Sequence, residues 1–370
     1  MWQWWNFCTA SIPHGKRLLK INVDETSICL FQGNVKGNVL VSKKRRREDV
    51  PVQRIPRSRR RCYLTHVAFV CDQPELQALL PQVVIGNQVA LPASAMPTLT
   101  AACPSNVRLV RQKSAWNNQN LMALIIRILA AALGPYKDRF QPVLLLDAVR
   151  LHFAQAVLNA CNSCGIWLVL VPAKTTWLLQ PLDTHAFQSF KIQLRNAYQR
   201  ARVQAGRHDL SVKDFLACIY EAIHSVLEGR DWSSAFNENG FGHGQAETRA
   251  YIKRQLGVES PLVVASARPS LEQLQCVFPG RTVVPTAALW RPFDPVVAPK
   301  AKALPGMVLA PKPFSSASPS PVTRLGRTRS EHKRAETEVL AAAASSSAEA
   351  KSVPIAHRLK WCRPKAVIEC

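Results

Sequence analysis

The order of the apolar segments predicts an α/β fold, with a sheet flanked by helices. Residues 142–147 form a continuous apolar run that ends in Asp147, as is typical of a strand buried on both faces. A helical pattern follows over about 152–162, and a second apolar run covers 166–171. The order strand, helix, strand implies a right-handed parallel βαβ unit.

The segments before this unit supply further elements of the sheet. We expect strands over residues 18–23, 28–32, 63–71 and 81–86. The acidic stretch Asp24–Ser27 lies between the first two and is expected to form a turn. The stretch 117–133 starts with Asn and carries apolar residues at helical spacing, and Gly134–Pro135 follows it, so it should form a well-buried helix.

Two helices are expected after the unit. Asp183 begins the first, whose apolar stripe consists of Phe187, Phe190, Leu194 and Tyr198. The second covers about 211–227. The sequence therefore divides into an N-terminal segment (1–17), a catalytic-type domain (18–257) and a low-complexity basic tail (258–370). Prolines and an Ala/Ser tract lead us to expect that the tail is mostly disordered.

The charge of the chain indicates a polyanionic partner. Its 370 residues contain 48 Lys and Arg against 24 Asp and Glu, which gives a net charge of +24. Nucleic acid is the simplest partner for such an excess, and the alternatives are an acidic protein or a basic tail without a specific role. A basic loop insert covers residues 33–61. Its candidate DNA-contacting residues are Lys43, Lys44, Arg45, Arg46, Arg47, Arg57, Arg59, Arg60 and Arg61.

The same basic runs have two other interpretations, a nuclear import signal and a solvated loop without a partner. We expect a nuclear protein. The eleven cysteines follow no regular framework, so free thiols in a reducing compartment are expected. Cys161 and Cys164 lack a second pair at matching spacing, which argues against structural zinc. No signal peptide is expected, and the absence of a run of 18 apolar residues predicts no membrane span.

Three aspartates lie where strands end or helices begin: Asp24, Asp147 and Asp183. Ligands collect at strand ends in open α/β sheets. If the three carboxylates converge, each pair about 4 Å apart would repel by about 4 kcal/mol at an effective dielectric near 20. Hard divalent cations relieve such repulsion. Taken singly, Asp183 also fits a helix N-cap and Asp24 fits a turn residue.

Three ordered motifs carry a resemblance to a known family. Residues Asn22–Ser27 resemble the first-aspartate motif of the DDE superfamily endonuclease domain of pogo, tigger, jerky and centromere-protein-B-like transposases. Residues 144–147, with His152 five positions after Asp147, resemble the second motif. Residues 172–183, with Leu179–Asp183 reading LQPLD, closely resemble the third. The 36 positions between the second and third aspartates suit the mariner–pogo group.

The resemblance covers roughly residues 15–245 and implies an RNase H-like fold, a mixed sheet flanked by helices. It further implies that Asp24, Asp147 and Asp183 are catalytic and bind two Mg²⁺ or Mn²⁺ ions. Asp24 and Asp147 would bridge the metals, and Asp183 would hold the second. The implied activity is two-metal cleavage and strand transfer on DNA. The implied partners are DNA and further copies in a homo-oligomer, with no membrane.

Two departures from the family pattern leave an alternative open. The family usually has Asn after the second aspartate, where this sequence has Ala148. Family members also carry helix-turn-helix modules before the catalytic domain, and no such module is visible before residue 18. A truncated element, a domesticated remnant and an incomplete gene model all fit this. The alternative function is a catalytically inactive nucleic-acid-binding protein that keeps the fold. A structural chromatin protein acting through its basic tail is a third, weaker hypothesis.

Overall fold

The computed structural model describes residues 1–29, 63–206, 210–242, 250, 253–257, 259, 270 and 291–295. The basic insert, including its nine candidate DNA-contacting residues, and most of the expected tail lie outside the described residues. All described residues belong to one compact unit, Met1–Phe314.

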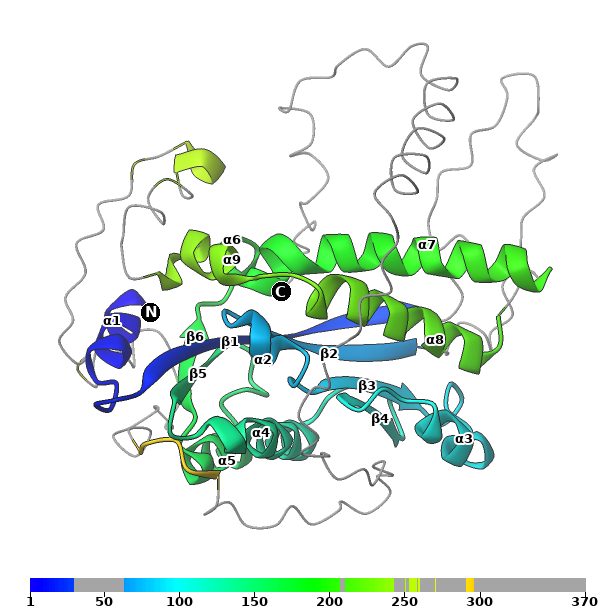
Figure 1. The fold of residues 1–370 in the computed structure, drawn as a ribbon, viewed down its shortest axis with the longest axis horizontal. Helices are drawn as coiled ribbons and strands as arrows, with labels where there is room; N and C mark the ends of the chain where they lie inside the picture. Colours follow the sequence, from blue (N-terminus) through cyan, green and yellow to red (C-terminus); the bar gives the residue numbers. More distant parts are fainter. Residues whose placement is uncertain are drawn as a thin grey trace, which may run out of the picture. The chain divides into compact units, whose positions relative to one another are not determined.

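A six-stranded mixed sheet forms the centre of this unit (Figure 1). The strands are β1 (Arg17–Cys29), β2 (Tyr63–Cys71), β3 (Gln82–Asn87), β4 (Val107–Gln112), β5 (Phe140–Asp147) and β6 (Trp167–Val171). Their order across the sheet is β4-β3-β2-β1-β5-β6. β1 pairs antiparallel with β2 and β2 with β3, whereas the pairs β3–β4, β1–β5 and β5–β6 are parallel. The predicted α/β fold with a mixed sheet is therefore confirmed.

β5 shows why the sheet needs helices on both faces. Val143 and Leu145 point into one apolar cluster, which also contains residues of the helices that follow β6. Leu144 and Leu146 point into a second cluster, shared with the helices on either side of β5 in the sequence. Because successive side chains of a strand point to opposite faces, an all-apolar strand buries both its faces.

The two helical layers are formed by different parts of the chain. One face is covered by α4 (Gln119–Leu133) and α5 (Gln155–Cys164), and the other by α7 (Phe187–Ala205) and α8 (Val212–Ala222) (Figure 1). The Asn118 side chain accepts hydrogen bonds from the backbone of Asn120 and Leu121 and so caps α4. Gly165 ends α5 in the left-handed conformation.

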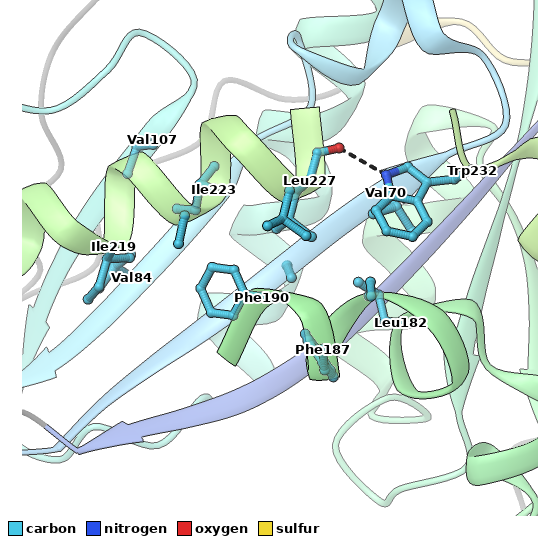
Figure 2. Close-up of a cluster of buried hydrophobic side chains, with 14 of the residues drawn as sticks. Val70, Val84, Val107, Leu182, Phe187, Phe190, Ile219, Ile223, Leu227 and Trp232 are labelled. Carbon is cyan, nitrogen blue, oxygen red and sulfur yellow. Dashed lines mark hydrogen bonds between the residues drawn. The ribbon is translucent and has the colours of Figure 1, made fainter. Parts of the chain in front are cut away.

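The apolar stripe predicted for the helix after Asp183 packs as expected. Phe187 and Phe190 of α7 meet Ile219 of α8 and Val70 of the sheet in one cluster (Figure 2). At its edge, the Trp232 indole donates to the Leu227 carbonyl over 2.9 Å.

Shorter elements complete the described chain. They are α1 (Trp2–Ala10), α2 (Pro74–Gln77), η3 (Ala93–Ala95), α3 (Met96–Ala101), η4 (Gly134–Tyr136), α6 (Thr176–Leu179), η5 (Leu182–Ala186), η6 (Ile223–Glu228), α9 (Ser233–Phe236) and η7 (Asn237–Phe241). α1 was not predicted. It lies against β6, where the buried Trp4 indole donates to the Leu168 carbonyl over 2.8 Å.

One expectation for the first strands is wrong. Residues 24–27 form no turn, because β1 continues through them and each residue pairs with β2, from Asp24 opposite Ala68 to Ser27 opposite Thr65. Pairing with a full-length partner strand overrides the low strand propensity of the acidic residues. Asp24 therefore lies within a strand that is held on both sides.

The helix Gln119–Tyr136, formed by α4 and η4, is long and apolar enough to cross a membrane by length and composition alone. Its residues Leu121, Ile125 and Leu129 are fully buried in the cluster between the sheet and α5. The core helix of a folded domain meets the same criteria of length and composition.

Candidate functional site

The three predicted aspartates lie on one face of the sheet, beside its central strands. β1 and β5 run parallel, with Asn22 opposite Leu145. Two positions further along both strands, this register places Asp24 beside Asp147. Asp183 lies in the π-helical turn η5, just before α7. Asp24 and Asp183 contact each other through their side chains.

The buried amide of Asn22 ties together the segments that carry the aspartates. Its Nδ2 donates to the Leu145 carbonyl of β5 over 3.1 Å, and its Oδ1 accepts from the Leu182 backbone N–H over 2.8 Å. Asn22 has no exposed surface. One side chain on β1 thus fixes β5 two residues before Asp147 and η5 one residue before Asp183.

Asp24 and Asp183 are two carboxyl groups that act on each other's pKa. Burial raises the pKa of Asp24 to about 8, and the charges of Asp183 and Asp147 act in the same direction. Burial also raises the pKa of Asp183, although a hydrogen bond from Thr176 and the charge of Lys191 oppose this rise. The pair titrates as a unit.

Asp147 is held by a histidine. His152 Nδ1 lies 2.6 Å from Asp147 Oδ1 and 3.1 Å from the carbonyl oxygen of the same residue. Its Nε2 lies 4.0 Å from Glu25 Oε1, which accepts from Asn117 Nδ2 over 2.6 Å. Burial of the His152 ring lowers its pKa, but the contact with Asp147 outweighs burial, and the net pKa is raised.

Glu25 and His152 extend the site to the other face of the sheet. Neighbouring residues of a strand point to opposite faces, so Glu25 lies on the α4 side while Asp24 lies on the α7 side. Burial raises the pKa of Glu25 as well. No role was expected for Glu25 from the sequence, although it follows Asp24 directly. His152, five positions after Asp147 in the second motif, is buried, with a side chain only 3% exposed.

The loop of the third motif is organised mainly by its threonines. Thr175 Oγ1 donates to the Pro172 carbonyl over 2.8 Å, and a hydrogen bond from Thr176 lowers the pKa of Asp183. The Gln180 side chain of the same loop forms no such bond to a described residue. Within the described chain, its buried amide nitrogen and oxygen both lack a hydrogen-bond partner.

The predicted metal ligands are close in the fold, but they do not form a three-ligand set. Within the described residues, no group of three or more His, Cys, Asp or Glu side chains is arranged to hold a metal ion. Asp24 and Asp183 face each other, whereas Asp147 contacts His152. The donor chemistry nevertheless fits a hard divalent cation, because all three groups are carboxylates and two of them have raised pKa values.

Ala148 stands where the family usually has Asn. Its side chain packs against the apolar cluster on the α4–α5 face. A methyl group there supplies no hydrogen-bonding atom beside Asp147. The cysteines of the described chain are free thiols in buried positions, including Cys161 and Cys164.

Residues 66–236 match the sequence family described as DDE superfamily endonuclease. The match contains Asp147 and Asp183, and Asp24 lies before it. The resemblance carried by the second and third motifs is therefore confirmed over this region, which makes up just under half of the chain.

Among solved structures, the chain is similar to "Mos1 transposase paired-end complex with left transposon end". The two share 14% identity over 65% of this chain and 62% of that one, with a TM-score of 0.31. The chain thus spans less than two thirds of that protein, and the likeness identifies no residue of the site. No curated protein matches the chain.

The Asn22 bridge predicts a large stability effect. Asn22→Ala leaves the Leu145 carbonyl and the Leu182 N–H buried without partners, and each such group costs about 1–3 kcal/mol. We expect the free energy of unfolding, measured in urea, to fall by about 2–4 kcal/mol. Ser27→Ala, at an exposed position of the same strand, is the matched control. Equal stabilities of the two variants would contradict the assigned role of Asn22.

The raised pKa of Asp24 predicts a pH dependence of stability. The folded state binds the Asp24 proton more tightly than the unfolded chain, whose ordinary pKa is 3.8. This advantage is complete at low pH and is lost as pH rises toward about 8. Asn cannot ionise, so Asp24→Asn in EDTA should keep a melting temperature a few degrees above wild type at pH 8, a difference that shrinks by pH 5.

The exposed Asp138 provides the control for this measurement. Asp138→Asn should follow the wild-type melting curve at every pH. Parallel pH profiles for wild type and Asp24→Asn would show that Asp24 does not carry the linkage.

Proposed function

We propose that this domain is a transposase-derived DDD endonuclease that cleaves DNA phosphodiesters and transfers the cut strand. The observation that carries the proposal is the convergence of Asp24, Asp147 and Asp183 on one face of the sheet. Two of these three residues lie within the family match. The net charge of +24 supports a polyanionic substrate.

Asp24, Asp147 and Asp183 would hold divalent metal, Mg²⁺ or Mn²⁺. The bound ions would supply Lewis-acid stabilisation of the phosphate and a lowered pKa for the attacking hydroxyl. The protein's own contribution is positional. Asn22 keeps β1, β5 and η5 in fixed relation, so the aspartates of all three are oriented before substrate arrives.

His152 has a defined place in this proposal. Its Nδ1 lies 2.6 Å from Asp147 Oδ1 and bonds to the Asp147 backbone carbonyl, so Asp147 would use its second oxygen, or move away from His152, to help hold a metal ion. Burial is the main cause of the raised pKa of Asp24, and repulsion from Asp183 and Asp147 adds to it; a bound cation would offset both effects.

The outer face of α7 supports a path for the DNA backbone away from the aspartates. Lys191 and Arg195 are exposed on this helix, which begins four residues after Asp183. Lys191 Nζ lies 5.7 Å from the centre of the Phe187 ring, and its charge acts on Asp183. Trp177 of α6, 55% exposed, lies beside Thr176, which bonds Asp183. Cations and an exposed aromatic ring beside the site suit a nucleic acid.

The alternative is a nucleic-acid-binding protein without cleavage activity, located, like the enzyme, in the nucleus. Two observations favour it: Ala148 replaces the usual Asn, and Asp147 contacts His152 instead of completing a three-ligand set. This protein would share the basic surface but have no use for metal.

Cleavage of supercoiled plasmid tests the catalytic proposal. We expect nicking by the purified chain with Mg²⁺ or Mn²⁺ and none in EDTA. Asp147→Ala and Asp183→Ala should each lower the rate by at least about a hundredfold, because each removes a metal ligand. Asp138→Ala, which removes an exposed carboxylate outside the site, should leave it unchanged. Salt-sensitive DNA binding without nicking would support the alternative instead.

Charge reversal on α7 tests the DNA path under either function. Lys191→Glu with Arg195→Glu should weaken DNA binding in EDTA and reduce the slope of log K against log salt by about one unit per lost contact. Lys213→Glu with Arg230→Glu makes the same charge change at exposed positions on and beyond α8. Equal losses in both double variants would indicate a general charge effect and would contradict a path along α7.

A further inference from the structure

A short segment far along the chain packs into the described core. Residues 291–295, with the sequence Arg-Pro-Phe-Asp-Pro, fall in the region that we expected to be a mostly disordered tail. Phe293 is only 2% exposed and joins the apolar cluster formed by α4, α5 and the sheet. In Figure 1 the segment is the gold trace beside α5. These five residues are ordered exceptions within a tail that was expected to be mostly disordered.

Polar groups of the core satisfy the backbone of this segment. The Trp167 indole donates to the Arg291 carbonyl over 2.9 Å, and the Phe293 N–H donates to Gln141 Oε1 over 2.9 Å. Lys16 Nζ donates to the Phe293 carbonyl over 3.2 Å. The recognition therefore combines one apolar anchor with hydrogen bonds to an extended backbone.

Gln141 and Gly165 of the core allow the backbone of residues 292–294 to approach closely. Gln141 has no exposed surface, and its Nε2 donates to the Gly165 carbonyl over 2.8 Å, which fixes its Oε1 toward Phe293. A Cβ atom at Gly165 would lie 2.2 Å from the Pro292 carbonyl oxygen. The Asp294 N–H donates to the carbonyl of Cys164 over 3.2 Å. The end of α5 thus accommodates peptide backbone where a side chain would block it.

The peptide side suits binding as a short linear motif. Pro292 and Pro295 have no N–H to leave unpaired and restrict the backbone, which lowers the entropy lost on docking. The ion pair of Asp294 with Lys137, 3.7 Å apart and about 40% exposed on both sides, adds little. Phe293 and the backbone contacts therefore supply most of the affinity.

This place is separate from the carboxylate site. Gln141 stands near the start of β5 and Asp147 at its end, six residues further on. At about 3.3 Å per residue, the two sites are about 20 Å apart along the strand. A peptide bound at the Gln141 end of β5 therefore does not touch the carboxylate site.

We propose that Lys16, Gln141, Trp167 and the Cys164–Gly165 end of α5 form a docking site for a linear peptide of the Arg-Pro-Phe-Asp-Pro type. Its resident ligand is the Arg291–Pro295 segment of the same chain. The interaction is carried by the peptide itself, so the docked segment can be replaced by a free peptide of the same sequence. The site fastens residues 291–295 to the end of the sheet remote from the aspartates.

The experiment uses the full-length chain and a fluorescent peptide of residues 288–297. Phe293→Ala removes the anchor of the resident segment and leaves the docking site intact. The peptide should bind this variant, and bind wild type at least about tenfold more weakly, because a tethered segment competes at an effective concentration near millimolar. A peptide with Ala in place of Phe should bind neither chain.

A conservative change in the core tests the contact geometry. Adding Trp167→Phe to Phe293→Ala keeps an aromatic ring but removes the indole donor to Arg291, and should weaken peptide binding by about three- to tenfold. A folded Phe293→Ala chain that does not bind the peptide would overturn the proposal.

A second measurement covers the case in which Phe293→Ala does not fold. A protease site inserted after residue 270 of the wild-type chain allows the chain to be cut without substitution in the motif. The C-terminal piece should stay with the core during gel filtration, and excess 288–297 peptide should release it. Separation of the two pieces immediately after cleavage would also overturn the proposal. Neither outcome depends on nicking activity or DNA binding.

Discussion

The two hydrogen bonds of the buried Asn22 amide hold the candidate site in place. Three segments far apart in the sequence have to bring a carboxylate to one point, and the repulsion between carboxylates opposes this. Asn22 lies on the strand that carries Asp24. Its side-chain nitrogen donates a hydrogen bond to β5, and its side-chain oxygen accepts one from η5. Because the amide is fully buried, neither bond competes with water. Burial, and to a lesser extent the neighbouring carboxylates, raise the pKa values of Asp24 and Asp183.

The three aspartates around Asn22 have different surroundings. Asp24 and Asp183 influence each other's pKa on the α7 face, whereas Asp147 contacts His152, whose other nitrogen approaches Glu25 on the α4 face. Charged groups on both faces of the sheet therefore surround Asp147 at the end of β5. His152, which contacts Asp147 and approaches Glu25, connects the two sides.

The sequence predicted the parts of the fold whose pattern is local. The all-apolar β5, the Asn-capped α4 and the apolar stripe of α7 each follow from neighbouring residues. The turn expected at Asp24–Ser27 failed because the ladder with β2 depends on residues about forty positions away. The three aspartates were found through the motifs, but the roles of Asn22 and His152 depend on partners that spacing alone does not reveal. Phe293 was missed because its proline-rich surroundings resemble a segment without a core.

The hairpin of β1 and β2 explains how this domain tolerates its long basic insert. The ladder continues to the pair Cys29 and Tyr63, so the chain leaves and re-enters the sheet at neighbouring points. Loop closure costs only about 0.6 kcal/mol for each doubling of length, and the sheet already holds the two ends together. The pairing up to Cys29 and Tyr63 therefore keeps the two strand ends together whatever the length of the connection between them. This junction is a natural position for grafting a foreign sequence.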